Sequence, residues 1–133
     1  MIGVVIATHG RLAEELLRTA ETVVGRIEQA RAVAVDPAVQ DMRAALTDAI
    51  KSVDTGEGVL LITDLPGGSP TNLCLSFLTE RKVEVVTGVN LPMLLKLGQL
   101  RGSGRPIVQV ARDLVESGQR AIGHASGMLR GLG

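Results

Sequence analysis

The chain has 133 residues, and 14 Lys and Arg residues balance 14 Asp and Glu residues, so its formal net charge is zero. Charge neutrality offers no overall attraction for nucleic acid, and an aromatic content of 1% leaves no rings on which bases could stack. Hydrophobic residues make up 45% of the chain, which is enough for an aliphatic core, and we expect one domain over residues 1–133.

Processing and cofactor signals are missing from the sequence. The N-terminal residues lack the basic segment and cleavage site of a signal peptide, and no apolar run is long enough to span a bilayer. The lone Cys74 suits a reducing compartment, so we expect a cytoplasmic protein without direct membrane insertion. No residues show metal-ligand spacing, and neither Gly-x-Gly pair has the context of a dinucleotide site, so neither metal nor other cofactor is predicted.

The first half of the chain predicts two strands, each followed by a helix. An apolar run over residues 2–7 is typical of a buried strand, and it stops at the polar sequence Thr8-His9-Gly10. A helix is predicted over 11–24, and a second strand over 30–35. We expect Asp36 and Pro37 to begin the next helix, which runs to Val53. The expected apolar stripes are Leu12, Leu16, Ala20 and Val23 in the first helix, and Val39, Met42, Ala45, Leu46, Ala49 and Ile50 in the second.

The second half repeats this alternation. A third strand over 59–63 ends at Asp64, and Ser69-Pro70 is a typical helix start. A fourth strand is predicted over 83–87, with helices over 91–100 and 107–116. Residues 119–125 are interpreted as a further strand, and the glycine-rich residues 126–133 as a loose tail.

Strands that alternate with helices predict an α/β fold, because parallel strands need crossover connections. We expect an open three-layer sandwich with a mostly parallel sheet of order 2-1-3-4 and helices on both faces. The switch point of this order lies between the first and third strands. His9 and Asp64, each just beyond the carboxyl end of one of these strands, are therefore expected to be neighbours.

These residue types together indicate phosphoryl chemistry. A carboxylate that accepts the N–H of one imidazole nitrogen leaves the other nitrogen free as a nucleophile, and Asp64 can do this for His9. Gly67 and Gly68 precede a predicted helix N-terminus, where free N–H groups bind anions. Ser69 and a nearby threonine add hydroxyl donors. The set fits a histidine that accepts a phosphoryl group and passes it on.

Three motifs carry a family resemblance along nearly the whole chain. They are Thr8-His9-Gly10 after the first strand, the segment Asp64-Leu65-Pro66-Gly67-Gly68-Ser69-Pro70-Thr71-Asn72 after the third, and Gly88-Val89-Asn90-Leu91-Pro92-Met93-Leu94 after the fourth. With these motifs in this order, the chain resembles the IIA domain of the mannose-family phosphoenolpyruvate-dependent sugar phosphotransferase system.

The resemblance implies that His9 is phosphorylated by the phosphocarrier protein HPr and donates to a IIB component. It implies that Asp64 bonds the ring nitrogen that is not phosphorylated. It also implies a homodimer in which a C-terminal antiparallel strand, here 119–125, is exchanged between subunits. The residues expected to contact the phosphoryl oxygens are Gly67, Gly68, Ser69, Thr71 and Asn72.

Other interpretations stay open. The same loop could bind a small anion or a phosphorylated metabolite without covalent chemistry, or the protein could be a scaffold with a vestigial site. Cys74 is expected to be a buried hydrophobe, His124 a structural or exposed group, and Asn90 a turn residue.

Overall fold

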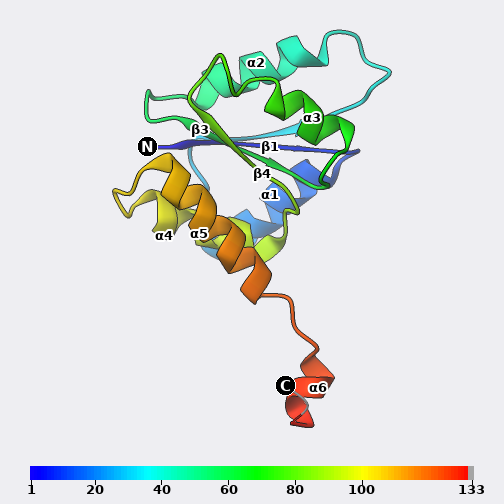
Figure 1. Ribbon diagram of the computed structural model, residues 1–133, viewed down its shortest axis with the longest axis vertical. Coiled ribbons are helices and arrows are strands. Elements are labelled where there is room, and N and C mark those ends of the chain that lie inside the picture. Colours follow the sequence, from blue (N-terminus) through cyan, green and yellow to red (C-terminus); the bar gives the residue numbers. More distant parts are fainter. Residues whose placement is uncertain (132–133) are drawn as a thin grey trace.

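The computed structural model describes residues 1–131, and its centre is a sheet of four parallel strands (Figure 1). The strands are β1 (Gly3–Thr8), β2 (Ala30–Ala34), β3 (Val59–Thr63) and β4 (Val83–Val86). Their order is β2-β1-β3-β4 with every neighbouring pair parallel, which confirms the predicted topology.

Helices cover both faces of this sheet (Figure 1). They are α1 (Leu12–Val24), α2 (Met42–Val53), α3 (Ser69–Leu75), α4 (Leu91–Arg101), α5 (Ile107–Arg120) and α6 (Ala125–Leu129). Side chains of α1, α4 and α5 pack with Val4 and Ile6 on one face. Those of α2 and α3 pack with Val5 and Ala7 on the other. Alternate residues of β1 thus serve two cores, which explains why its sequence is continuously apolar.

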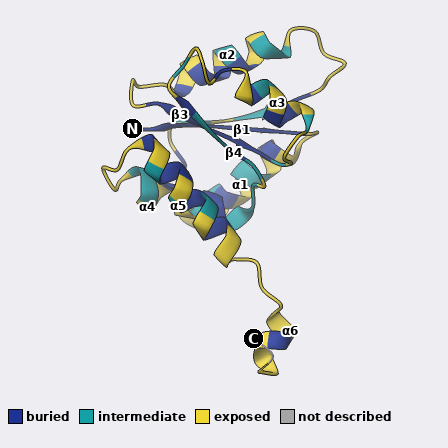
Figure 2. Ribbon diagram, in the orientation of Figure 1, coloured by how far each residue is buried: buried dark blue, intermediate teal, exposed yellow. Residues whose placement is uncertain are grey.

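Figure 2 shows that the buried residues gather in the sheet and on the helix faces turned towards it. Phe77 is the one aromatic residue of the chain, and its side chain is fully buried. The guanidinium of Arg43 lies 4.3 Å from the centre of the Phe77 ring. Gly3 lies directly against the end of α2, because a Cβ atom there would lie 2.4 Å from the carbonyl oxygen of Val53. The end of α2 therefore needs glycine at the start of β1.

Two helix boundaries differ from the prediction. The helix expected from Pro37 begins only at Met42. The residue before it, Asp41, has a left-handed backbone with a φ of 62°, which a continuous α-helix does not allow. Asp36 instead accepts a hydrogen bond from the Ala38 N–H at 2.9 Å, so it caps a turn. Further on, α5 continues beyond residue 116 to Arg120.

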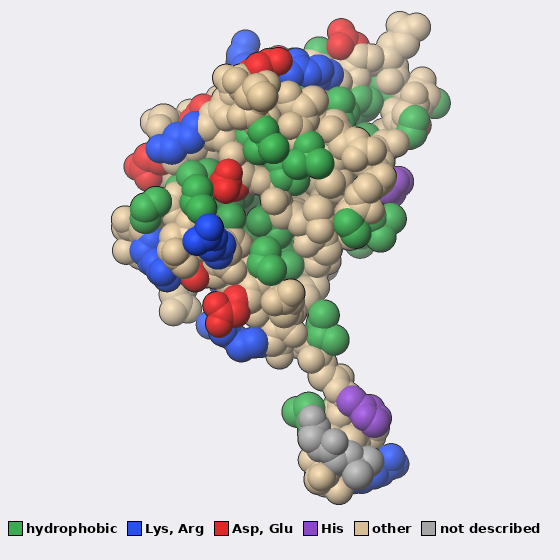
Figure 3. All heavy atoms as spheres, viewed as in Figure 1, with side chains coloured by type: hydrophobic (Ala, Val, Ile, Leu, Met, Phe, Trp, Pro, Cys, Tyr) green, Lys and Arg blue, Asp and Glu red, His purple; other side chains and the backbone are tan. Residues whose placement is uncertain are grey.

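The strand expected over 119–125 does not form within the single chain. Residues 119–120 complete α5, and α6 begins at Ala125, so no strand forms over 119–125 in this chain. The expected loose tail is helical over 125–129, while residues 132–133 lie outside the described part. Figures 1 and 3 show that α6 projects away from the body on a thin connection. A segment without its own sheet partner has no reason to be a strand in one chain.

The apolar stripe of α1 was also partly wrong. Ala20 is buried as expected, but Leu12 is 45% exposed and Val23 is 61% exposed. The side chain buried near the start of the helix is Ala13, and it is 1% exposed. In α2 the stripe is confirmed at Leu46, Ala49 and Ile50, but Ala45 is exposed. Val39 lies outside the helix and is 52% exposed.

Candidate functional site

His9 stands at the tight turn between β1 and α1. Thr8, the last residue of β1, is fully buried, and its hydroxyl oxygen accepts a hydrogen bond from the Ala13 N–H at 2.7 Å. The same hydroxyl donates to the carbonyl of His9 at 3.1 Å. Gly10 then adopts a φ of 53°, which allows the chain to turn at once into α1. The turn fixes the His9 backbone at the carboxyl edge of the sheet.

Asp64 holds His9 through two hydrogen bonds to one carboxylate oxygen. Its Oδ2 lies 2.9 Å from Nδ1 of the ring and 3.0 Å from the backbone nitrogen of His9. An ionised carboxylate can only accept, so Nδ1 carries the proton and Nε2 keeps a free lone pair. The His9 side chain is 47% exposed and that of Asp64 is 10% exposed. The predicted neighbourhood of these two residues, 55 positions apart, is confirmed.

The surroundings keep Asp64 ionised. Burial on its own raises the pKa of this carboxyl, but the hydrogen bonds from the His9 ring and backbone outweigh it. The pKa of Asp64 therefore lies below its usual value of 3.8. The second oxygen, Oδ1, is buried and has no hydrogen-bond partner within residues 1–131.

The glycine loop lies directly against the His9 ring. A Cβ atom at Gly68 would lie 3.1 Å from Cε1 and 3.7 Å from Nε2 of that ring, so the bare backbone faces the free nitrogen. Gly67 has a φ of 76°, a conformation that favours glycine. The exposed Asn72 braces the loop: its N–H donates to the carbonyl of Gly68 at 2.9 Å, and its side-chain amide donates to that of Gly67 at 3.3 Å. Ser69 opens α3 with its side chain exposed.

Thr71 occupies a different position from the rest of the loop. It is 4% exposed, its hydroxyl donates to the carbonyl of Leu65, and its oxygen lies 2.5 Å from the hydroxyl oxygen of Thr63. The hydroxyl therefore points inwards and ties α3 to the end of β3 on either side of Asp64. Among the residues expected to contact phosphate, Thr71 is buried under the loop and supports it.

Sequence reasoning missed the two strand-end threonines, Thr8 and Thr63. Both are fully buried, and each precedes a site residue by one position. The available signal was a hydroxyl at the end of an otherwise apolar strand, a position where a side chain can satisfy backbone groups of the following turn.

The third motif lies in a supporting layer. The side-chain oxygen of Asn90 accepts a hydrogen bond from the Met93 N–H at 3.1 Å and caps α4. Its amide donates to the carbonyl of Gly118 at 3.1 Å, which ties α4 to α5.

Burial raises the pKa of the Cys74 thiol to about 12, so this group is an inert part of the core, as predicted. His124 is exposed and bonds Ser126 near α6, far along the chain from the site.

Residues 1–131 hold no group of three or more potential metal-ligating side chains. In the same range, none of the helices combines the length and apolar character needed to cross a membrane.

Known proteins resemble this chain in sequence. The family model described as "PTS system fructose IIA component" matches residues 3–113. The mannose-specific EIIAB component of Escherichia coli is 32% identical over 124 residues, which cover 91% of this chain and 38% of that protein. The fructose-specific EIIA component of Bacillus subtilis is 31% identical over 106 residues, covering 76% of this chain and 71% of that protein. The chain thus spans well under half of the longer E. coli relative.

Solved structures resemble it in fold. Component EIIA from Streptococcus agalactiae superposes with a TM-score of 0.82 at 27% identity, covering 95% of this chain and 98% of the other. The IIA protein associated with the fucose utilization operon of Streptococcus pneumoniae gives a TM-score of 0.80 at 28% identity, with 96% and 95% covered. Sequence, topology and the match over residues 3–113 agree, and this chain belongs to the mannose/fructose family of IIA components of the sugar phosphotransferase system.

Proposed function

We propose that this protein, as a single mannose-type IIA domain, is a phosphoryl carrier that accepts a phosphoryl group from phospho-HPr on His9 and passes it to a IIB partner. The transfer would serve sugar uptake or a regulatory branch of the phosphotransferase system. One observation carries the proposal. Asp64 occupies Nδ1 at 2.9 Å, while Nε2 of a side chain that is 47% exposed has no hydrogen-bond partner within residues 1–131. The ring is thus held in the tautomer that a nucleophilic Nε2 requires.

In the accepting step, the Nε2 lone pair attacks phosphorus. The bond from phosphorus to the donor atom of phospho-HPr breaks as the bond to Nε2 forms. The Nδ1 proton stays between ring and carboxylate, and the negative charge of Asp64 stabilises the cationic ring that attack produces. Transfer to the IIB partner is the same displacement in the other direction, with His9 as the leaving group. Little covalent machinery is needed beyond positioning and charge stabilisation.

The loop beside Nε2 is the proposed contact surface for the phosphoryl oxygens. The backbone of Gly67 and Gly68 and the exposed side chains of Ser69 and Asn72 supply N–H and O–H donors there. Thr71 contributes indirectly, because its hydroxyl bonds the Leu65 carbonyl and Thr63 and so keeps the loop against the ring.

Radiolabelling tests the proposal. Incubation with labelled phosphoenolpyruvate and the general phosphotransferase components should give an acid-labile, base-stable phosphoprotein. His9→Ala should abolish the label, while the matched variant His124→Ala should keep it. Label that persists in His9→Ala would contradict the assignment. Saturable binding of inorganic phosphate by both variants, without covalent label in the parent, would support the non-covalent binding module instead.

We further propose that the protein is a homodimer in the cytoplasm. No strand within residues 1–131 pairs with the outer edge of β4, and this supports the dimer, because an open strand edge is a template for pairing with another chain. The C-terminal segment from residue 121 carries exposed Ile122 and Leu129, which its own chain leaves uncovered. In the proposed dimer, this C-terminal segment is exchanged between the two subunits. A reducing compartment suits the lone buried thiol of Cys74.

A further inference from the structure

A cavity of about 290 Å³ opens at the amino edge of the sheet, at the opposite end of β1 from His9. The six residues of β1 separate the two places by roughly 20 Å. The cavity lies between the end of α1, the connection to β2 and the outer part of α4. The residues that matter for its chemistry are Val24, Arg26, Glu28, Leu94, Gly98 and Arg101.

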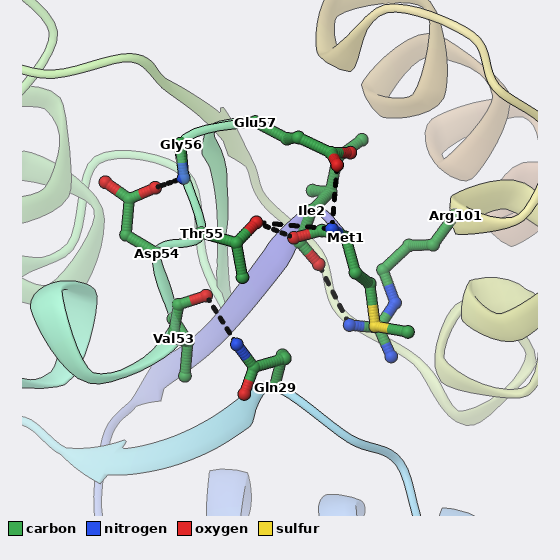
Figure 4. A network of polar contacts seen from close by, with 9 residues as sticks. All are labelled: Met1, Ile2, Gln29, Val53, Asp54, Thr55, Gly56, Glu57 and Arg101. Atoms are coloured by element: carbon green, nitrogen blue, oxygen red, sulfur yellow. Dashed lines mark hydrogen bonds and ion pairs between the residues drawn. The ribbon is translucent and has the colours of Figure 1, made fainter.

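Arg101 is held in place at this cavity. Its Nη1 donates to the carbonyl of Ile2 at 2.9 Å, and Figure 4 shows the side chain reaching from α4 to the start of β1, beside Met1. The Nε atom is buried and has no hydrogen-bond partner within residues 1–131. The guanidinium is therefore oriented by the fold while part of its donor capacity stays unused.

The charges around the cavity favour an anion. The residues that line it include two arginines, Arg26 and Arg101, and one glutamate, Glu28. None of the three forms an ion pair within 4.0 Å in the described part of the chain. Burial lowers the pKa of Arg101, and the nearby carboxylate of Glu28 offsets only part of this, but an arginine guanidinium keeps its proton at neutral pH. The net charge of these lining groups is positive, which the zero charge of the whole chain conceals.

The remaining wall is apolar and has space over it. Leu94 is fully buried beneath the cavity, and Val24 stands at its margin with 51% of its surface exposed. Gly98 lies in the middle of α4, where glycine is unfavourable for a helix. A Cβ atom there would meet nothing within 4 Å, so close packing does not require the glycine. A larger side chain at this position would instead fill the cavity.

We propose that this cavity binds a small organic anion with a compact apolar body. The anionic group, a carboxylate or a phosphate monoester, bonds the guanidinium of Arg101, and the apolar body packs over Gly98 and against Val24. The volume suits a body of the size of one six-membered ring. This site is separate from the phosphoryl chemistry proposed for His9, and neither depends on the other.

The test is an NMR titration of the full chain with benzoate, phenyl phosphate and the neutral benzyl alcohol. Benzoate or phenyl phosphate should shift the amide signals of residues 26–28 and 94–101 and saturate with a Kd on the order of 1 mM. Whichever of the two binds more tightly identifies the anionic group. Benzyl alcohol should bind at least about tenfold more weakly, because it makes no charge-assisted bond to Arg101.

Two variants, each with a matched control, decide the outcome. Gly98→Leu should fill the cavity and remove saturable binding, whereas Gln99→Leu, on the exposed side of α4, should not. Arg101→Gln should weaken binding by about tenfold, and the exposed Lys96→Gln should leave it unchanged. Binding that survives Gly98→Leu, that is equal for benzyl alcohol, or that shifts the loop at Gly68 would overturn the proposal. Labelling of His9 in Gly98→Leu reports separately on phosphoryl transfer.

Discussion

At the scale of single residues, the site depends on the missing side chain of Gly68. Its φ of −82° and ψ of 172° suit any residue, so alanine fits the backbone there. The added Cβ would nevertheless lie 3.1 Å from Cε1 of His9 and push the ring aside. We expect Gly68→Ala to slow labelling of His9 by about ten- to hundredfold, the usual effect of a displaced reactive group. Rapid-quench labelling measures this rate.

The control is Gly98→Ala, whose new methyl group meets no atom within 4 Å. Its labelling rate should equal that of the parent. If Gly68→Ala also labels at the parent rate, the ring tolerates the contact, and the loop does not define its position.

Asp64→Asn tests the charge of this carboxylate. The asparagine oxygen can accept both N–H bonds that Oδ2 of Asp64 accepts, so the Nδ1–H tautomer of His9 is kept. The variant lacks the negative charge that stabilises the cationic ring formed on attack, so we expect transfer to slow by about 10- to 100-fold. Rapid-quench labelling measures this rate, and the ring ¹⁵N shifts of His9 should keep the Nδ1–H pattern. Transfer at the parent rate would contradict this role.

Asp64 also makes stability depend on pH in one direction. Its pKa in the folded state lies below the usual value of 3.8, so the folded protein binds the proton less readily than the unfolded chain does. The contribution is fully present above that value and is lost as the pH falls through the lower, folded pKa. Urea unfolding of the parent should therefore show a steeper loss of stability below about pH 4 than Asp64→Asn shows.

At the scale of elements, the connection from β3 to α3 is stabilised by one buried pair of hydroxyls. Thr71→Val keeps the shape but removes the donor to Leu65 and leaves the hydroxyl of Thr63 without its partner. We expect a loss of about 1–3 kcal/mol in the free energy of unfolding. Thr71→Ser should restore most of it, and urea unfolding distinguishes the two. Equal losses in both variants would point to packing of the methyl group instead.

Strands β1 and β3 could be predicted from the sequence, because their apolar runs and the polar residues that end them follow simple rules. The β1 and β3 runs are apolar throughout since both faces of the sheet are covered, and each polar interruption, at Thr8 and at Asp64, marks a strand end. The parallel strand order places the ends of β1 and β3 side by side, so the proximity of His9 and Asp64 could be predicted from topology alone.

Helix faces and helix starts were less predictable. In α1, the small Ala13 and Ala20 lie against the sheet while the larger Leu12 lies outside, because the turn after Gly10 sets the rotation of the helix. The start of α2 depended on the left-handed backbone of Asp41, for which the sequence has no glycine to signal it. Both features are set by tertiary contacts that no local pattern records.

At the scale of the whole molecule, the proposed dimer gives a direct prediction. Ile122 is 78% exposed and Leu129 is 90% exposed on the projecting segment, so burial in a second copy would account for both. Sedimentation velocity at micromolar concentration should show a dimer, and the double variant with Ile122→Asp and Leu129→Asp should shift it to monomer. The matched variant Val23→Asp, at a position 61% exposed on α1, should remain dimeric. A monomeric parent would contradict the proposal.

The same segment shows why sequence reasoning fails at a chain end. A strand over 119–125 was expected mainly from the resemblance, but these residues have no partner strand among residues 1–131, and helix α5 continues to Arg120. Residues 119–120 are therefore helical as the end of α5. A strand conformation of the C-terminal segment would need contacts with another molecule.

The shared oxygen of Asp64 has a final consequence. Because Oδ2 accepts from both the ring and the main-chain N–H of His9, the nucleophile and the turn that carries it are fastened by a single atom. A brief local opening of that turn breaks both hydrogen bonds at once. The imidazole then loses its fixed orientation and tautomer even though β1 stays paired in the sheet. The protection of the His9 amide against deuterium uptake is therefore a readout of how large a share of the molecules is ready to react at any moment.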